Sequence, residues 1–436
     1  MPLKNKQKIL FACNKCSYTT PRWLGKCPDC GAWNSFEEEV QVKHSSIHKK
    51  LVLPTFLAAV GSDNYQRFSC GINEIDRVLG GGLVVGSFIL LGGAPGIGKS
   101  TLLLQLASLA AKKIFYVSGE ESLSQIKMRA DRLNVKNKNL MLIATDSLAD
   151  VEAGIKTQKP DILIIDSIQT IYHPDIPNSV GTVTQIKEVT NSLLRLAKSE
   201  NITIFLVGHI TKDGNLAGPK VLEHMVDVVL YFEDDKGIYR IIRGFKNRFG
   251  NTSEIAVFEM TGQGLLEVSD PDRIFYDDRS LAASGSVLST VVEGSRALNI
   301  EVQALVTRNG QGIGRRQVTG IDVNRLFFLL AVLEKRLEIN LYAQDVFINL
   351  VGGIKVKDIS LDLAICAGII SSYFDAEIPA NVAFLGEVGL GGEIRPVNFS
   401  DERENRLKSF GVEQIITHTV LKNVRELLQF VKNFSK

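Results

Sequence analysis

The chain has 436 residues, 45% of them hydrophobic, and its 50 Lys and Arg nearly balance its 48 Asp and Glu to give a net charge of +2. Because domains usually run to about 100 to 200 residues, this length predicts two large domains. So small a charge excludes a general basic coat, so any nucleic-acid surface must be local. Apolar stretches fall short of the roughly 18 residues that span a bilayer, and we expect a cytoplasmic protein with no membrane contact.

Four of the six cysteines lie near the N-terminus in two C-x-x-C pairs, Cys13 with Cys16 and Cys27 with Cys30. Two such pairs supply the four thiolates of a tetrahedral Zn²⁺ site, and a cytoplasmic compartment disfavours the alternative of disulfides. Four thiolates close the coordination shell. The metal is therefore expected to be structural and to supply folding energy to this short segment.

Basic and aromatic residues lie in the same segment, namely Arg22, Trp23, Lys26 and Trp33. Two interpretations stay open: these residues present cations and stacking rings to nucleic-acid bases, or the two tryptophans form the small core of the segment. Residues 37–64 mix acidic, basic and polar runs with little periodicity, which predicts a linker.

A glycine-rich loop at residues 93–100 has the spacing G-x-x-x-x-G-K-S, follows an apolar run and leads into a leucine-rich segment. The glycines let backbone N–H groups face phosphate oxygens, Lys99 neutralises the β- and γ-phosphates, and Ser100 offers a hydroxyl to Mg²⁺. This order of strand, loop and helix predicts a nucleoside triphosphate site. Its predicted contacts are Gly93, Ala94, Pro95, Gly96, Ile97, Gly98, Lys99, Ser100 and Thr101.

Apolar strands and amphipathic helices alternate after the loop. We expect strands at 88–91, 114–117, 141–144, 162–165 and 202–207, and helices from Ser100 and at 122–134, 148–159 and 183–200. Ser122 and Gln125 have the spacing of a capping box at the start of one helix. The pattern predicts an α/β fold with a parallel sheet covered on both faces, whose ligands gather at the carboxyl ends of the strands.

Three of these strand ends carry polar side chains. Asp166 follows four apolar residues and is predicted to anchor Mg²⁺ from its second coordination sphere, complementing Ser100. Glu120 is predicted to activate the attacking water, with Glu121 as the alternative base. His209 is predicted to sense the γ-phosphate and to relay its loss into the following loop, and a helix-capping role is the alternative.

Residues 69–83, before the phosphate loop, resemble the entry to a RecA-type ATPase core. With the four cysteines and the motif Lys246-Asn247-Arg248-Phe249-Gly250, nearly the whole chain resembles the RadA (Sms) family of bacterial DNA repair proteins. Ala94 stands where that family often has an acidic residue, and because the position contributes backbone to the loop, we expect phosphate binding to be kept. The cofactors implied are ATP, Mg²⁺ and Zn²⁺.

The resemblance implies a DNA-dependent ATPase of the helicase type that assists homologous recombination and DNA repair. Its implied action is branch migration on single-stranded and branched DNA, as a hexameric ring and in partnership with the RecA recombinase. A nucleotide-gated scaffold that binds partners without translocating is an alternative.

Lys246 and Arg248 lie two residues apart on a segment expected to be extended, so both side chains point to one side. A phosphate loop with its own metal anchor and base still lacks a cation for the charge that builds at the γ-phosphate. Resemblance to ring-shaped RecA-fold helicases implies that this pair reaches the ATP of a neighbouring subunit, and a surface basic cluster is the alternative. The same resemblance turns residues 170–182 and 211–219 toward the channel, where Lys212 and Lys220 are candidate DNA contacts or solvated charges.

From about Ser284 onward the chain resembles the peptidase domain of Lon proteases, most clearly in residues 386–397. A Ser–Lys peptidase needs a hydroxyl nucleophile beside an amine, but the matched positions hold Leu361 and Asp401. We therefore expect an inactive domain that builds the ring, and Ser360, one residue off, keeps an ATP-dependent peptidase as an alternative. The basic residues Arg308, Arg315 and Arg316 are candidates for a DNA surface there.

The expected organisation is thus a four-cysteine zinc knuckle at 1–36, a linker at 37–64, a RecA-like ATPase core at 65–275 and an α+β Lon-protease-like domain at 284–436. Cys70 and Cys366 stand apart from the knuckle and are expected to be buried as small hydrophobic residues.

Overall fold

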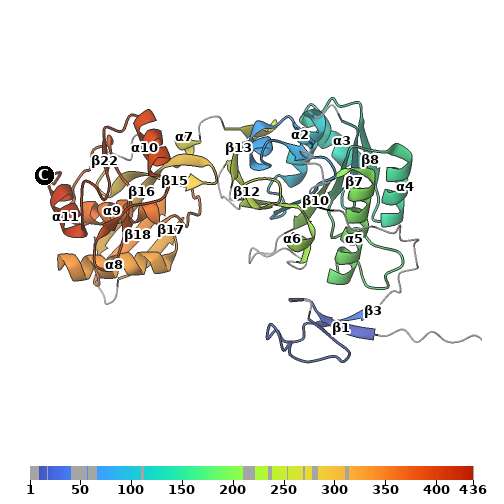
Figure 1. Cartoon of the computed structure of the whole chain (residues 1–436), viewed down its shortest axis with the longest axis horizontal. Coiled ribbons are helices and arrows are strands. Elements are labelled where there is room, and N and C mark those ends of the chain that lie inside the picture. The colour runs from blue at the N-terminus through green and yellow to red at the C-terminus, as the bar shows by residue number, and fades with distance from the viewer. Residues whose placement is uncertain are drawn as a thin grey trace, which may run out of the picture. The chain divides into compact units, whose positions relative to one another are not determined.

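A computed structural model describes residues 9–16, 18–40, 56, 66–109, 112–209, 221–233, 238–252, 254–268, 271–276, 283–309 and 314–435. The chain divides into two compact units, Met1–Glu267 and Val268–Lys436 (Figure 1). None of the helices in these ranges combines the length and the apolar character that crossing a bilayer requires.

The cysteine-rich segment folds as a small antiparallel sheet of β1 (Ile9–Cys13), β2 (Thr19–Thr20) and β3 (Phe36–Val40) in the order β2-β1-β3. Its core consists of Cys13, Cys27 and Phe36, against which Phe11 and Cys16 pack. The alternative that places the tryptophans in this core is wrong, because Trp23 is 52% exposed and Trp33 71% exposed. The converging cysteines and Phe36 fill the small interior and leave the indoles at the surface.

The ATPase core is built on a sheet of nine strands in the described ranges, with the order β14-β13-β12-β11-β6-β10-β9-β7-β8. The strands from β11 to β8 in this order are parallel, and β12, β13 and β14 add an antiparallel edge. Their bounds are β6 (Phe88–Gly93), β7 (Ile114–Ser118), β8 (Leu140–Ala144), β9 (Ile162–Asp166), β10 (Thr203–His209), β11 (Val228–Glu233), β12 (Tyr239–Asn247), β13 (Ile255–Thr261) and β14 (Gly264–Glu267). A separate strand pair, β4 (Arg67–Phe68) with β5 (Leu83–Val84), precedes them.

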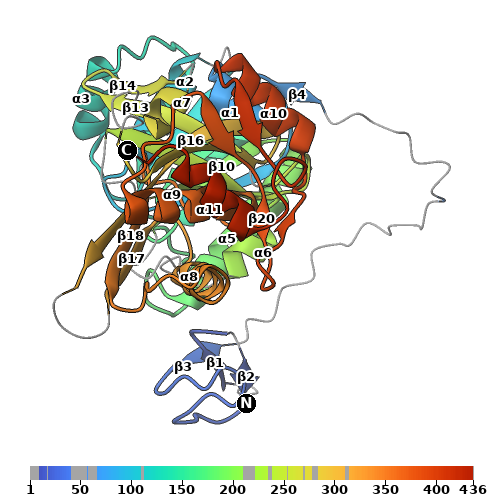
Figure 2. The same cartoon turned by 90° about the vertical axis from the view of Figure 1, so that its left-hand side faces the viewer.

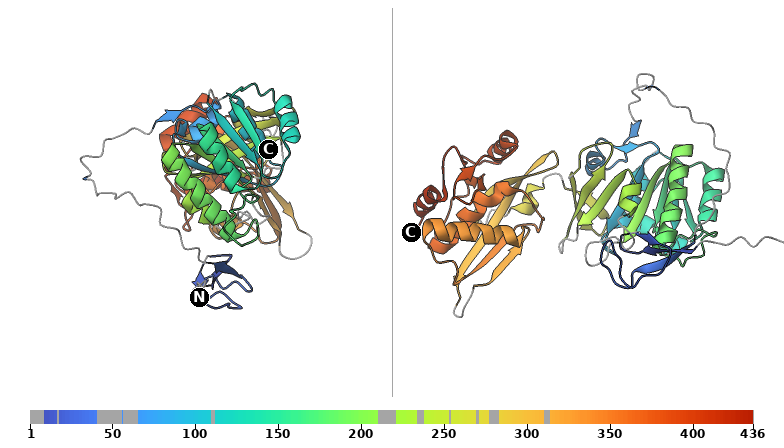
Figure 3. Two further views of the ribbon diagram at one scale, coloured as in Figure 1. Left: turned by 90° about the vertical axis from the view of Figure 1, so that its right-hand side faces the viewer. Right: turned by 60° about the horizontal axis from the view of Figure 1, so that its bottom comes forward.

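Helices cover both faces of this sheet, as is usual for parallel strands that are buried on both sides. One face buries α1 (Asn73–Val78), α2 (Lys99–Leu109) and α3 (Leu123–Arg132). The opposite face buries α4 (Leu148–Gln158) and α5 (Val183–Glu200), the green helices in front of the sheet in Figure 3, right. A short helix, α6 (Val221–Met225), precedes β11.

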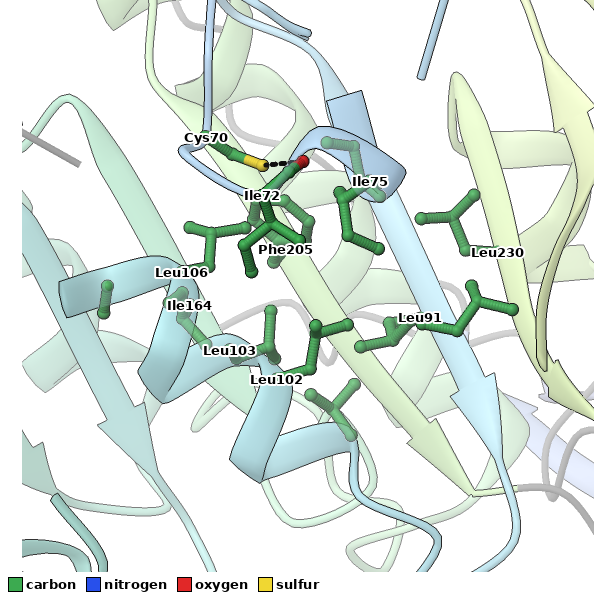
Figure 4. Close-up of a cluster of buried hydrophobic side chains, with 14 of the residues drawn as sticks. Cys70, Ile72, Ile75, Leu91, Leu102, Leu103, Leu106, Ile164, Phe205 and Leu230 are labelled. Atoms are coloured by element: carbon green, nitrogen blue, oxygen red, sulfur yellow. Dashed lines mark hydrogen bonds between the residues drawn. The ribbon is translucent and has the colours of Figure 1, made fainter. Parts of the chain in front are cut away.

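The α2 face of the core is shown in Figure 4. Leu102, Leu103 and Leu106 of α2 pack against Leu91 and Phe205 of the sheet, and all five side chains are nearly inaccessible to solvent. Cys70 is fully buried on the same face, and its Sγ lies 3.6 Å from the carbonyl oxygen of Ile72. Cys366 is also fully buried, so both lone cysteines behave as expected.

The predicted α/β fold with a parallel sheet is confirmed, and each predicted strand or helix ends within two residues of its observed bound. The predicted capping box is also present, since the Ser122 hydroxyl accepts from the Gln125 backbone N–H and the Gln125 side chain accepts from that of Ser122.

The second unit is a mixed α+β fold around a six-stranded sheet, in the described ranges, of order β17-β18-β16-β15-β19-β22. Helix α9 packs against β15 and β16 and contacts α8 and α11 (Figure 2). The strands are β15 (Ser286–Glu293), β16 (Arg296–Arg308), β17 (Arg316–Thr319), β18 (Gln344–Leu350), β19 (Val382–Phe384), β20 (Glu387–Val388), β21 (Ile394–Arg395) and β22 (Gln414–Ile416). The helices are α7 (Asp272–Phe275), α8 (Val323–Leu337), a 3₁₀ turn at Ile359–Leu361, α9 (Asp362–Phe374), α10 (Ser400–Ser409) and α11 (Val424–Lys432).

Candidate nucleotide-binding site and zinc centre

The glycine-rich loop connects β6 to α2, as the sequence predicts for a phosphate-binding loop. Gly96 and Gly98 have φ angles of 77° and 120°, which other residues rarely adopt. The Lys99 ammonium is buried and donates to the carbonyl oxygens of Gly93 at 2.8 Å and Ala94 at 2.9 Å. Burial lowers the pKa of Lys99, against the opposing effect of the carboxylates of Asp166 and Glu120. The loop backbone thus surrounds the Lys99 ammonium, the group that would contact the phosphates.

The carboxyl ends of four neighbouring strands bring the predicted site residues together. His209 lies level with Gly93 in the pairing of β10 with β6, and Asp166 lies level with Ser118 in the pairing of β9 with β7. They enclose a pocket of about 310 Å³. Its lining residues are Pro95, Gly96, Gly98, Lys99, Ser100, Thr101, Ser118, Glu120, Glu121, Arg129, Arg132, Asp166 and His209.

Asp166 ends β9 and faces this pocket, where Ser100 lies at the start of α2. The Tyr116 hydroxyl on β7 donates to Asp166 Oδ2 at 2.6 Å. Burial and the neighbouring Asp166 carboxylate raise the pKa of Tyr116 well above its ordinary value, so the phenol keeps its proton. A carboxylate and a hydroxyl are the oxygen ligands that a phosphate-bound Mg²⁺ takes, so Ser100 and Asp166 fit the metal.

The two acidic residues after β7 have different surroundings. Glu121 is bound by Arg129 through two hydrogen bonds of 2.6 and 2.8 Å. Glu120 Oε1 accepts from the Ser167 hydroxyl at 2.6 Å and lies 3.2 Å from His209 Nε2. A carboxylate held in a bidentate pair with arginine is a poor proton acceptor, so the geometry favours Glu120 as the base.

Replacing Glu120 by glutamine is expected to lower the turnover number of ATP hydrolysis about a hundredfold, the lower range for loss of a general base, with nucleotide affinity unchanged. The matched change Glu121→Gln is expected to cost less than about fivefold, because it weakens one ion pair at the pocket wall. Steady-state hydrolysis and nucleotide titration of both variants check this. A larger loss in Glu121→Gln than in Glu120→Gln would reverse the assignment.

His209 closes the pocket between the loop lysine and the predicted base. Its Nδ1 lies 3.4 Å from Lys99 Nζ, and its Nε2 lies 3.2 Å from Glu120 Oε1. The imidazole therefore touches both groups that would respond to loss of the γ-phosphate. The loop that follows, with Lys212 and Lys220, lies outside the described residues.

The predicted cation pair, Lys246 and Arg248, lies at the end of the sheet where the parallel strands begin, opposite the end that carries the phosphate loop. Asn247 and Ile89 both pair with Val228 of β11, so the motif is level with the start of β6, whereas the phosphate loop leaves from Gly93 at its other end. Four residues of strand separate the two levels, which is about 13 Å at 3.3 Å per residue. Lys246 and Arg248 therefore lie away from the phosphate loop of their own chain.

Both cations contact residues 223–227. Lys246 Nζ donates to the carbonyl oxygens of Glu223 at 2.8 Å and Val226 at 2.7 Å, and burial, with the nearby charge of Arg248, lowers its pKa. Arg248 remains 54% exposed and bonds Asp227 Oδ1 at 3.1 Å, while Asp227 Oδ2 accepts from the Phe88 backbone N–H at 3.2 Å.

The rest of the motif fixes the chain that follows the cations. Asn247 donates to the Val78 carbonyl oxygen at 3.3 Å and accepts from the Phe249 N–H at 2.9 Å. At Gly80, which has a φ of 81°, a Cβ would lie 3.2 Å from the Gly250 Cα. The motif is thus seated on the glycine turn that precedes the phosphate loop.

The four cysteines Cys13, Cys16, Cys27 and Cys30 converge, with all four sulfur atoms within 4.8 Å of one another. The sulfurs of Cys13 and Cys30 are 3.6 Å apart, and those of Cys16 and Cys27 are 3.5 Å apart. A tetrahedron of thiolates around Zn²⁺ has edges of about 3.8 Å, given Zn–S bonds of about 2.3 Å. The site therefore fits a structural zinc ion.

Replacing Cys13 by serine is expected to reduce bound zinc from about one equivalent per chain to a small fraction, because one of four thiolates is lost. The strands β1 to β3 then lose protection in hydrogen exchange, while the ATPase core keeps its own. Metal analysis with exchange mass spectrometry measures both effects, and Cys366→Ala is the cysteine control. Full zinc content in Cys13→Ser would contradict the four-thiolate site.

In the second unit, the two positions matched to a peptidase dyad hold neither a hydroxyl nor an amine, and they differ in burial. Leu361 is buried and Asp401 is exposed on α10. The hydroxyl of Ser360 is fully buried and accepts from Arg403 Nη1 at 2.8 Å, and Arg403 is in turn paired with Asp358 at 2.6 Å. A guanidinium cannot take a proton from serine, so this geometry does not activate Ser360.

The candidate DNA-binding residues of the second unit differ in exposure and in their hydrogen bonds within the unit. Arg308 and Arg315 are exposed. Arg316 is already hydrogen-bonded within the unit, since its Nη2 donates to the Leu341 carbonyl oxygen at 2.8 Å.

Two models of known protein families match parts of this chain. Residues 11–38 match the model of a rubredoxin metal binding domain, and residues 62–215 match that of an AAA domain. Among solved structures, a KaiC-like protein from Pyrococcus horikoshii matches 47% of this chain and 99% of its own, with 19% identity and a TM-score of 0.40.

Curated relatives extend over nearly the whole chain. The DNA repair protein RadA of Streptococcus pyogenes serotype M6 is 47% identical over 418 residues, which cover 94% of this chain and 92% of that protein. The RadA proteins of Campylobacter jejuni and Bacillus subtilis are 48% and 42% identical, each over 92% of its own length. The chain therefore belongs to the RadA family of DNA repair proteins and carries an AAA/RecA-like ATPase domain beside its zinc-binding site.

Proposed function

We propose that this chain is a DNA-dependent ATPase motor of the cytoplasm that promotes branch migration during homologous recombination and repair. In this proposal it works as a hexameric ring on single-stranded and branched DNA, beside the RecA recombinase. The observation that carries the proposal is the placement of Lys246 and Arg248 at the edge of the sheet away from their own phosphate loop. A cation pair held there can serve the nucleotide of a neighbouring subunit.

The proposed reaction divides its groups between two subunits. In one subunit, Lys99 and the loop N–H groups bind the β- and γ-phosphates, and Ser100 and Asp166 would hold Mg²⁺. Glu120 takes a proton from the water whose oxygen bonds to the γ-phosphorus as the bond to ADP breaks. Mg²⁺, when bound, neutralises charge on the phosphate oxygens.

The neighbouring subunit supplies Lys246 and Arg248, which stabilise the charge that develops on the γ-phosphate. Arg248 is 54% exposed, and among the described residues its guanidinium pairs with Asp227, which leaves donors for this task. A lone subunit has an incomplete site, so hydrolysis requires assembly.

Coupling to DNA is proposed to pass through His209. This side chain contacts Lys99 and Glu120, and the chain then continues into the segment that carries Lys212 and Lys220. A change at the γ-phosphate would move one end of a segment whose other part contacts the DNA backbone. Hydrolysis and DNA contact are then linked in both directions.

The test is the rate of ATP hydrolysis with and without single-stranded DNA, read beside strand displacement from a branched substrate. We expect the rate to rise with single-stranded DNA and the branch point to move only when ATP is hydrolysed. Unbranched duplex of the same length is the control substrate. Nucleotide-dependent DNA binding without a stimulated rate and without displacement would replace the motor by a nucleotide-gated scaffold.

A further inference from the structure

Two hydroxyl groups cross between the neighbouring strands β7 and β9 at the carboxyl edge of the ATPase sheet. Tyr116, on β7, donates to Asp166 Oδ2 at the end of β9, at 2.6 Å. Ser167, directly after β9, donates to Glu120 Oε1, two residues after β7, also at 2.6 Å. Each strand thus carries one carboxylate of the site and the hydroxyl that holds the carboxylate of the other strand.

The hydroxyls are buried, whereas the carboxylates reach the pocket. Tyr116 is 1% exposed and Ser167 is 0% exposed, while Asp166 and Glu120 both line the pocket. Hydrogen bonds of this length between a hydroxyl and a carboxylate are among the strong ones, and they strengthen further away from water. Neither hydroxyl can turn to solvent, so each is committed to its carboxylate.

Each bond occupies one oxygen and leaves the other. In the contacts of the described residues, Asp166 receives its hydrogen bond at Oδ2, and Glu120 receives those of Ser167 and His209 at Oε1. Asp166 Oδ1 and Glu120 Oε2 accept none of these bonds and would be open to the metal site and to the attacking water.

The backbone directly after β7 is also held against β9 and the residues that follow it. The Gly119 N–H donates to the Asp166 carbonyl oxygen at 3.0 Å, and a Cβ at Gly119 would lie 2.0 Å from Thr170 Oγ1. Glu120 therefore starts from a backbone that cannot shift away from β9 without breaking this packing.

We propose that Tyr116 and Ser167 are reciprocal positioning residues of ATP hydrolysis, with Tyr116 orienting the metal carboxylate and Ser167 orienting the base. The inference rests on the roles proposed above for Asp166 and Glu120. The two residues act on different steps, because Tyr116 works through metal binding and Ser167 through the chemical step. Their loss should therefore have different signatures.

Tyr116→Phe removes one oxygen and keeps the buried ring. We expect the Mg²⁺ concentration for half-maximal binding of a fluorescent ADP analogue to rise about tenfold, the loss of one charge-assisted hydrogen bond, with binding in EDTA unchanged. Tyr231→Phe is the matched control, because the Tyr231 hydroxyl also donates to a carboxylate, that of Glu223, at 2.8 Å. The control is expected to keep the wild-type Mg²⁺ dependence.

Ser167→Ala is expected to lower the turnover number about tenfold, with the KM for ATP and the Mg²⁺ dependence of ADP binding unchanged. Ser289→Ala removes another fully buried hydroxyl, which donates to the Phe384 carbonyl oxygen in the second unit, and controls for a general loss of stability. Thermal unfolding of all variants confirms that equal amounts of folded protein are compared.

The outcomes separate this inference from the proposal on which it rests. Wild-type metal dependence in Tyr116→Phe, with impaired binding in Asp166→Asn, overturns the positioning role and leaves the metal carboxylate in place. Wild-type behaviour of Asp166→Asn itself removes the metal assignment. In the same way, an unchanged turnover number in Ser167→Ala beside a slow Glu120→Gln overturns only the role of Ser167.

Discussion

Replacing Lys99 by alanine is expected to abolish ATP hydrolysis, with a loss of at least about a thousandfold from the removal of a preorganised charge at the transferred phosphoryl group. In the structure the Lys99 ammonium is the cation that faces both Asp166 and Glu120 from the phosphate loop. It also satisfies the carbonyl oxygens of Gly93 and Ala94, so the loop loses its internal support together with its charge.

Phosphate release under saturating ATP and DNA measures this loss. Lys156→Ala, an exposed lysine on α4, is the control and should hydrolyse ATP at the wild-type rate. Turnover by Lys99→Ala within tenfold of the wild-type rate would refute the assignment of residues 93–100 as the catalytic phosphate loop.

Replacing Lys246 by alanine is expected to lower the rate of DNA-stimulated ATP hydrolysis about a thousandfold. This is the effect typical of a cation that a partner supplies to a phosphoryl-transfer site. Nucleotide binding should stay within about threefold of wild type, because the side chain lies away from the loop of its own subunit. Local packing should also survive, since Lys246 donates to backbone carbonyl oxygens at a helix end rather than filling the core.

Mixing the two inactive variants gives the sharpest measurement. A ring that contains both Lys99→Ala and Lys246→Ala subunits has some interfaces with an intact phosphate loop on one side and an intact cation on the other. Equal mixing is therefore expected to restore about a quarter of the wild-type rate, if subunits assort at random and each interface works alone. A mixture as inactive as its components would place Lys246 in the site of its own chain or outside catalysis.

The phosphate loop and the parallel strands could be predicted because their signals are local. Each strand from β6 to β10 is a short apolar run, and a fully buried parallel strand needs no other pattern. Asp166 and Glu120 could be placed because each follows such a run, and parallel strands end at the same edge of a sheet. The capping box at Ser122 is likewise complete within four residues.

The parts that were not predicted depend on pairing and packing that a short stretch of sequence does not show. The antiparallel strands β13 and β14 could not be assigned, because β13 is placed by pairing with β12 and β14 by pairing with β13, with no crossover helix between them. Tyr116 gave only a faint signal, a hydroxyl within a largely apolar strand, and its partner lies 50 residues away. The burial of the two tryptophans was wrongly expected as an alternative, because composition cannot show how little interior the cysteines leave.

Strand β6 joins two groups that serve different subunits in the proposed ring. Its first residue, Phe88, is bonded through its N–H to Asp227, the carboxylate that holds Arg248, and its last residue, Gly93, opens the phosphate loop. From Phe88 to Gly93 the strand rises by five residues, which is about 17 Å at 3.3 Å per residue. One short strand therefore connects the carboxylate that holds a cation proposed to serve a neighbouring nucleotide with the phosphate loop of its own subunit.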